Sequence, residues 1–169
     1  MSEQRILTHP DDHLRRISHA VTVFDEPLDQ QLRQQFLALE NTMRAGHSGV
    51  GIAAPQVGDN RRMIVVDCRA SMRPCNNHGL LFMANPVIES ASGERLGREG
   101  CLSVPDWVGM VPRAADIVLS FDDVDGQPQR MTSTGFEARV IQHEIDHLDG
   151  ILFIDRIVSS KTLIRRMHA

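Results

Sequence analysis

Residues 143 to 147 read HEIDH, so two histidines stand four positions apart and a glutamate directly follows the first. On an α-helix such histidines lie about 40° apart around the axis, so His143 and His147 can bind one metal ion. Glu144 lies about 100° from His143 and can reach a water molecule at that ion without binding the metal. The pattern is typical of hydrolytic metal sites, and the alternative is chance spacing on a polar helix face.

A hydrolytic metal ion usually has three protein ligands and an open position for water, so this site needs a third ligand. In the peptidase pattern HExxHxxGxxH a last histidine completes the set, but Phe153 stands at that position. Other zinc hydrolases use a downstream glutamate, whereas only Asp149 and Asp155 carry carboxylates after His147. Neither usual route therefore supplies the third ligand.

The three cysteines are the remaining candidates for that ligand. Cys68 ends an apolar strand pattern and is typical of a buried small residue, whereas Cys75 falls in a polar segment. Cys101 follows Gly100, where the backbone can approach another group closely. A buried structural thiol explains Cys101 equally well, so the residues by themselves leave the third ligand open.

The helix that carries HEIDH is predicted from about residue 136 to 149 and ends at Gly150. One face is apolar, and Phe136 and Val140 accompany the histidines on another side. We therefore expect a helix packed on two sides, with its histidines facing an enclosed pocket. Asp146 falls in a narrow polar stripe and is interpreted as solvated surface rather than as a group that orients a ligand histidine. The apolar face consists of Ala138, Ile141, Ile145 and Leu148.

A second helix is predicted from apolar residues at steps of three and four between Leu28 and Met43. It follows residues 25–27 and ends at Gly46. A further short helix is predicted after Pro10, with acidic residues beside its positive end.

The strand signals fall in the first two-thirds of the chain. Segments 61–68 and 80–90 have strand composition, and residues 116–132 form a hairpin pattern around Asp125-Gly126. Residues 46–58 are predicted to be a glycine-punctuated loop. Strands followed by a helix, without regular alternation, favour an α+β fold over a doubly wound sheet.

The composition excludes several classes of protein. The chain of 169 residues is 41% hydrophobic and 24% charged, which favours one globular domain spanning residues 1–169. Its 18 basic and 22 acidic residues give a net charge of −4, so we expect no DNA binding and no membrane attraction through overall charge. An odd number of cysteines and the lack of an export signal favour the cytoplasm.

Three segments together carry a resemblance to a known family: GVGIAAPQ at 49–56, EGCLS at 99–103 and QHEIDHLDG at 142–150. Their residues, order and separations resemble the three motifs of peptide deformylase, and the similarity runs over about residues 6–156. The resemblance implies an α+β fold in which antiparallel β-sheets surround a central helix that bears HExxH.

The resemblance also implies the metal ligands, namely Cys101, His143 and His147. It implies Fe2+ as the native ion, with Zn2+, Ni2+ or Co2+ able to replace it. A set of one thiolate and two imidazoles suits several such metals, so the spacing does not choose among them.

The implied reaction removes the formyl group from the N-terminal formyl-methionine of newly synthesised polypeptides and releases formate. In that chemistry metal-bound water attacks the formyl carbon, and Glu144 acts as general base and then acid. Gln56 and the backbone N–H of Leu102 match the donors that stabilise the oxyanion. Without the other motifs, Gln56 would be interpreted as a loop surface residue.

The resemblance implies a substrate pocket as well, in which Val50, Gly51, Phe136 and Val140 match positions that contact the peptide. An unbranched thioether side chain requires an apolar pocket of this kind.

Two positions depart from the family pattern. Gly97 stands where relatives often carry an aliphatic residue, and Arg139 replaces an apolar residue of the site helix. These departures predict a wider or more polar pocket. Glu99 also belongs to the motif, and we interpret it as the structural partner of a basic residue, Arg113.

The partners follow from the same resemblance, with formylated nascent polypeptides as the substrate. Lys161, Arg165 and Arg166 form a reduced basic patch for weak ribosome association, and the alternative is a solvated tail.

Three other functions compete with deformylation: an HExxH peptidase that cleaves internal bonds, a non-catalytic binder of formylated peptides, and a structural zinc module. The presence of Glu144 and Gln56 disfavours the binder, and the lack of a fourth ligand disfavours the zinc module.

Overall fold

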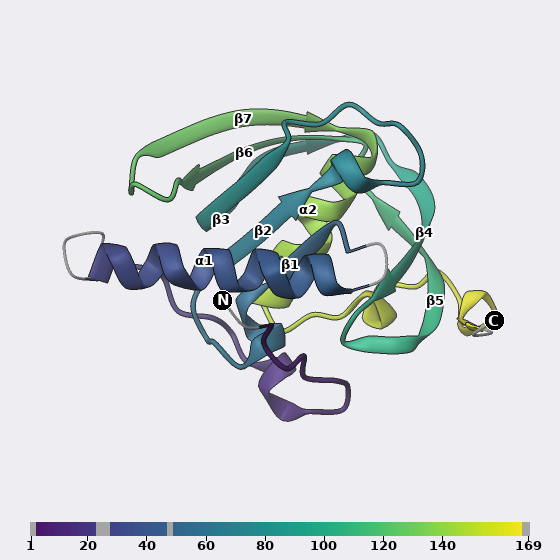
Figure 1. The fold of residues 1–169 in the computed structure, drawn as a ribbon. Helices are drawn as coiled ribbons and strands as arrows, with labels where there is room; N and C mark the ends of the chain where they lie inside the picture. Colours follow the sequence, from purple (N-terminus) through teal and green to yellow (C-terminus); the bar gives the residue numbers. More distant parts are fainter. Residues whose placement is uncertain (1–2, 23–27, 47–48, 167–169) are drawn as a thin grey trace.

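The computed structural model describes residues 3–22, 28–46 and 49–166, and Figure 1 shows its ribbon. No helix in these ranges is both long and apolar enough to cross a membrane. The two α-helices of the described chain are α1 (Leu28–Ala45) and α2 (Gly135–Leu148). The strands are β1 (Gly51–Ala53), β2 (Met63–Asp67), β3 (Leu80–Ser92), β4 (Arg95–Cys101), β5 (Val104–Arg113), β6 (Asp116–Asp122), β7 (Pro128–Thr134) and β8 (Ile164–Arg165).

Five strands form an antiparallel sheet in the order β1-β2-β3-β6-β7. Strand β2 is buried along its whole length because a helix covers each of its faces. Met63 and Val65 pack in the cluster that contains the apolar residues of α1, whereas Ile64 and Val66 pack with those of α2. Alternation of this kind follows from the two-residue period of a strand. The sheet therefore fixes the position of α2 through a continuous apolar contact.

The other three strands form a second antiparallel sheet in the order β4-β5-β8. A turn at residues 102–103 joins β4 to β5, so Cys101 lies at the end of the hairpin. Helix α2 runs between the five-stranded sheet and this hairpin (Figure 1). A residue at the end of β4 can thus reach a side chain on α2.

Helix α2 is buried on two sides, as the sequence predicts. Ala138, Ile141, Ile145 and Leu148 belong to the cluster that packs on the five-stranded sheet. On the other side Glu144 and His147 are 4% and 1% exposed, although both are polar. Polar groups buried in this way require partners or a function, because leaving water costs them free energy.

Most predicted elements are confirmed, including the α+β class, both long helices, β2, β3 and the hairpin of β6 and β7. Residues 25–27, which precede the predicted second helix, lie outside the described residues. The loop predicted over residues 46–58 is wrong in part, because Gly51–Ala53 pairs with β2. Strands β4 and β5 were not predicted from the sequence. The β4 segment contains two glycines and three charged residues, so its extended form depends on its cross-strand neighbours rather than on local propensity.

Candidate active site

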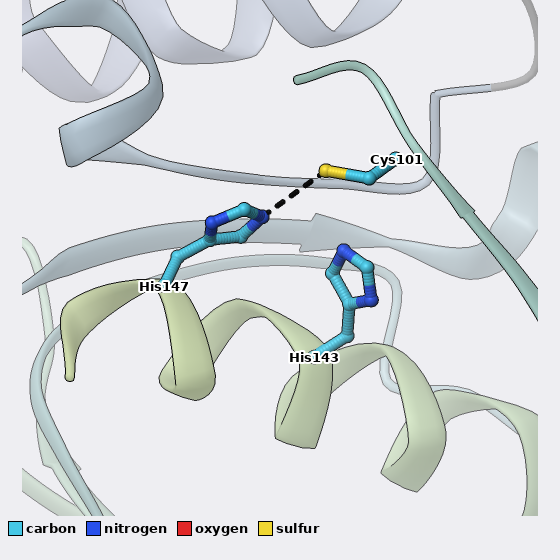
Figure 2. Close-up of side chains that lie close together, drawn as sticks. All are labelled: Cys101, His143 and His147. Carbon is cyan, nitrogen blue, oxygen red and sulfur yellow. Dashed lines mark hydrogen bonds between the residues drawn. The ribbon is translucent and has the colours of Figure 1, made fainter. Parts of the chain in front are cut away.

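Three side chains that can bind a metal ion meet between α2 and the end of β4 (Figure 2). His143 and His147 extend from successive turns of α2 toward the Cys101 sulfur. The Cys101 Sγ lies 3.3 Å from the His147 Nε2, and one ligand atom of each residue lies within 4.8 Å of the others. The structure therefore brings together the three residues that the resemblance names as ligands.

The cluster fits a tetrahedral metal ion in both size and chemistry. Zinc–sulfur and zinc–nitrogen bonds of roughly 2.3 and 2.0 Å place two ligand atoms about 3.5 Å apart at tetrahedral angles. The separation of 3.3 Å between Cys101 Sγ and His147 Nε2 is close to this value. Burial lowers the pKa of His147 well below its usual range, so its imidazole is neutral, as a metal ligand must be.

Glu144 is buried beside this cluster and is held close to strand β1. Its Oε2 atom is buried and has no hydrogen-bond partner among the described residues. A Cβ atom added at Gly51 would stand 2.5 Å from the Glu144 Oε1 and 2.8 Å from Val140 Cγ1, so only glycine fits there. Burial raises the pKa of Glu144 to about 7. A carboxyl group with this pKa can take up and release a proton near neutral pH.

The side-chain amide of Gln56 has a defined orientation next to the cluster. Its Oε1 atom accepts a hydrogen bond of 2.9 Å from the Ala53 N–H, which leaves the NH₂ group facing the cluster. This NH₂ group lies 3.1 Å from Ser103 Oγ and 3.6 Å from Cys101 Sγ. Gln56 is 2% exposed, which excludes the alternative that it is a loop surface residue. Leu102, in the turn after Cys101, lines the cavity that opens beside these residues.

The cavity has a volume of about 480 Å³ and opens beside the metal-ligand cluster. The two ligands that line it, Cys101 and His143, lie next to Glu144. Its wall contains apolar groups from α2 and from the segment before β1. The lining includes all four residues named from the resemblance as substrate contacts, namely Val50 before β1, Gly51 at the start of β1, and Phe136 and Val140 on α2.

Glu99 forms a hydrogen bond with the imidazole of His143 and fixes its orientation. The His143 Nδ1 lies 2.9 Å from Glu99 Oε2, which orients the other ring nitrogen toward Cys101. Arg113 donates two hydrogen bonds to the same carboxylate and Arg139 donates a third, so the predicted partnership of Glu99 with Arg113 is confirmed. Burial alone would raise the pKa of Glu99, but Arg113 and His143 hold it at about 2. Glu99 is thus a buried anion that is fully paired.

The hydrogen bond with Glu99 also changes the pKa of His143. Burial lowers the pKa of His143, but hydrogen bonds with Cys101 and Glu99 prevail and raise it well above its usual range. A metal ion at the His143 ring therefore competes with a proton.

Asp146 is buried, contrary to the interpretation from the sequence. It is 6% exposed, so its assignment to solvated surface is wrong. Arg113 donates a hydrogen bond to it from one side, and Arg156 donates two from the other. Asp146 and Glu99 therefore share Arg113, which links α2 to β4 and β5. The sequence does not indicate that Asp146 joins the pair of Glu99 and Arg113, because it lies 33 and 47 positions from Arg113 and Glu99.

Comparisons with known proteins identify the family of this chain. The family model described as polypeptide deformylase matches residues 3–163. The chain is 43% identical over 164 residues to the peptide deformylase of Thermomicrobium roseum, covering 96% of this chain and 90% of the relative. The chain belongs to the polypeptide deformylase family. It is accordingly an enzyme of the peptide deformylase class.

Solved deformylase structures share this fold. The deformylase of Legionella pneumophila matches with a TM-score of 0.83 and 36% identity over 95% of this chain and 89% of the other. A deformylase of Acinetobacter baumannii, determined with Met-Ala-Ser bound, matches with a TM-score of 0.83 and 35% identity over 92% and 100% of the two chains. The expectation of antiparallel sheets around the site helix is therefore confirmed for this deformylase.

Two residues that line the deformylase cavity were not named as substrate contacts from the sequence. Arg98 immediately precedes Glu99 in β4, and Arg166 immediately follows β8. Arg98 belongs to none of the three motifs. Arg166 was predicted only as part of the basic patch or of a solvated tail. The pairing of β8 with β5 is a long-range contact that the local sequence does not specify.

Proposed function

We propose that the chain removes the formyl group from the N-terminal formyl-methionine of newly synthesised polypeptides, by hydrolysis within one catalytic domain. One observation carries this proposal: Cys101, His143 and His147 meet beside Glu144 and the Gln56 amide at a single cavity. In the overall reaction the C–N bond of the formamide breaks, the oxygen of water joins the formyl carbon, and formate and a free amine result.

Cys101, His143 and His147 would hold the metal ion that the family resemblance implies. Fe2+ is the ion we expect, and Zn2+, Ni2+ or Co2+ would suit the same ligands. When bound, the ion supplies Lewis acidity, which lowers the pKa of water to roughly 7. Glu99 supports this ligand set because it holds the ring of His143 in one orientation.

Glu144 would move the proton. Its carboxyl group lies beside the ligands, and one of its oxygens has no partner among the described residues. In its ionised form it accepts a proton from the attacking water, and in its protonated form it donates that proton to the leaving nitrogen. A pKa of about 7 makes both forms accessible at neutral pH.

Gln56 and the Leu102 N–H would stabilise the negative charge that develops on the formyl oxygen. The Ala53 N–H holds the Gln56 carbonyl oxygen, so the amide group is oriented before substrate binds. An oriented donor of this kind contributes roughly 3–4 kcal/mol to transition-state stabilisation, because no reorganisation is needed during the reaction.

Val50, Gly51, Phe136 and Val140 would contact the first residue of the peptide. They form an apolar part of the cavity wall, which suits the methionine side chain. The related Acinetobacter baumannii structure holds Met-Ala-Ser, a peptide that begins with methionine. Because nascent polypeptides are the expected substrate, we expect the activity in the cytoplasm, and Lys161, Arg165 and Arg166 are the candidates for a weak ribosome contact.

The experiment that tests this function measures formate release from formyl-Met-Ala by anaerobically purified protein, with metal analysis of the same sample. We expect one formate per free amine and intact internal peptide bonds. Glu144→Ala should abolish turnover and retain the metal. Cleavage of unformylated peptides at internal bonds would instead establish a peptidase, and a metal-loaded sample that releases no formate would refute the proposal.

A further inference from the structure

The last described residue of the chain lies at the active-site cavity rather than in a free tail. Strand β8 pairs with β5 through Ile164 and Arg165, and the Arg166 N–H donates a hydrogen bond of 2.7 Å to the Asp106 carbonyl oxygen. The Arg166 guanidinium lies over Gly100, since a Cβ atom added there would stand 2.4 Å from its Nη2. These contacts place a cation next to the residue that precedes the ligand Cys101.

A second exposed arginine lines the same cavity. Arg98 comes from β4, and both it and Arg166 are exposed. Among the described residues, no carboxylate forms an ion pair with either guanidinium. Arg139 also lines the cavity, but its guanidinium binds Glu99 and the carbonyl oxygens of Val111 and Arg95. Arg98 and Arg166 are thus the cavity arginines that form no ion pair with a carboxylate in the part of the chain that the structure describes.

The acidic residues of the described cavity wall do not neutralise these two cations. They are Glu99, which is paired with Arg113, Arg139 and His143, and Glu144, which is 4% exposed beside the ligands. The chain as a whole has a net charge of −4, so a positive cavity mouth does not follow from its composition. It is a local arrangement of charge at the place where a peptide would leave the site.

We propose that Arg98 and Arg166 form a carboxylate-recognition subsite, which favours formylated peptides with aspartate or glutamate shortly after the first residue. This inference rests on the proposed function, because it requires the formyl group to lie at the buried ligand cluster. The following residues of the peptide then pass the exposed mouth, where the two guanidinium groups lie. Arginine binds carboxylates through paired N–H donors, so an acidic side chain is the matching partner.

The test compares three amidated peptides, formyl-Met-Asp-Ala, formyl-Met-Ala-Ala and formyl-Met-Lys-Ala, by their kcat/KM for formate release. Amidation removes the terminal carboxylate, which would otherwise bind in place of the side chain. Exposed ion pairs contribute up to about 1 kcal/mol, so we expect the aspartate peptide to exceed the alanine peptide by roughly two- to five-fold. The lysine peptide should be slower than the alanine peptide, and 0.5 M salt should reduce both differences because it screens exposed charges.

The variants Arg98→Gln and Arg166→Gln should lose this preference while they keep the rate on formyl-Met-Ala-Ala. Arg73→Gln is the matched control, since Arg73 is exposed on a loop outside the cavity and its loss changes the net charge equally. Equal kcat/KM for the three peptides, or a preference that survives in Arg98→Gln/Arg166→Gln, would overturn the subsite. No formate from any peptide would refute the proposed function itself, so the two failures are distinguishable.

Discussion

The guanidinium of Arg139 lies directly beside Gly97, such that a Cβ atom added at Gly97 would stand 2.8 Å from the Arg139 Cζ. Hydrogen bonds to Glu99 and to the carbonyl oxygens of Arg95 and Val111 hold the guanidinium in place. The two departures from the family pattern are therefore one structural feature. The arginine head group occupies the space that a side chain at position 97 would fill.

Gly97→Ala is expected to displace this guanidinium and to weaken its hydrogen bond with Glu99. Because hydrogen bonds to charged groups contribute about 1.5–3 kcal/mol, the free energy of unfolding should fall by an amount in this range. In an Arg139→Leu background the same substitution should cost much less. Urea denaturation of the four proteins gives the coupling energy, and strictly additive effects would contradict the contact.

Cys101→Ala is expected to lose the bound metal, because the remaining two histidines form an incomplete ligand set. Cys68→Ala and Cys75→Ala are the matched controls and should retain it. Cys68 is buried in the core, and burial raises its pKa, so its thiol does not ionise readily. Elemental analysis after gel filtration measures the metal content, and loss of metal in Cys68→Ala alone would relocate the third ligand.

Gln56→Glu should lower kcat by about 10²–10³-fold, because a carboxylate can still accept from the Ala53 N–H but no longer donates to an oxyanion. KM should change much less, since the interaction forms in the transition state. Steady-state kinetics with formyl-Met-Ala measures both constants. A variant that keeps its kcat would remove Gln56 from the catalytic machinery.

Arg113→Met should destabilise the protein strongly, because it leaves the buried carboxylates of Glu99 and Asp146 without their shared partner. Breaking a buried ion pair in this way costs about 3–5 kcal/mol. The control Arg130→Met removes an exposed arginine that pairs with Glu89, and should cost less than about 1 kcal/mol. Urea unfolding at pH 7 compares the two, and equal losses would contradict the buried network.

The stability of the protein should depend on pH through Asp67. Hydrogen bonds from Arg69 first, and then from Arg44, hold the pKa of the Asp67 carboxyl well below its usual range against the effect of burial. Its stabilisation is present above the unfolded pKa of roughly 3.9 and is lost as the pH falls through the lower folded pKa.

Asp67→Asn should therefore be less stable than the original chain at pH 6, and the difference should shrink below about pH 4. Urea unfolding at pH 6, 4 and 2.5 measures it. A difference that stays constant over this range would show that the charge of Asp67 does not contribute.

The chemistry of α2 was predictable because it is local. The spacing of His143 and His147, together with the periodic apolar residues from Ala138 to Leu148, specifies a helix with both imidazoles on one side. Strand β2 was predictable for the same reason, because its run of apolar and β-branched residues is itself a local signal. The three-motif resemblance then pointed to Cys101 and Gln56, and the structure brings Cys101 to the two histidines and the Gln56 amide to Cys101.

The tertiary structure determines the burial of Asp146, the register of β4 and the position of Arg166, which no local sequence pattern specifies. Asp146 has the pattern of a surface residue on its helix, and only the approach of Arg113 and Arg156 makes it a buried, hydrogen-bonded carboxyl group. Strand β4 has weak intrinsic preference for an extended form, so its register, and with it the position of Cys101, comes from pairing with β5. The amino-acid order alone determines helix periodicity and residue chemistry, because these depend on neighbours along the chain. The charge at the cavity mouth depends instead on long-range strand pairing, which brings Arg166 to the site.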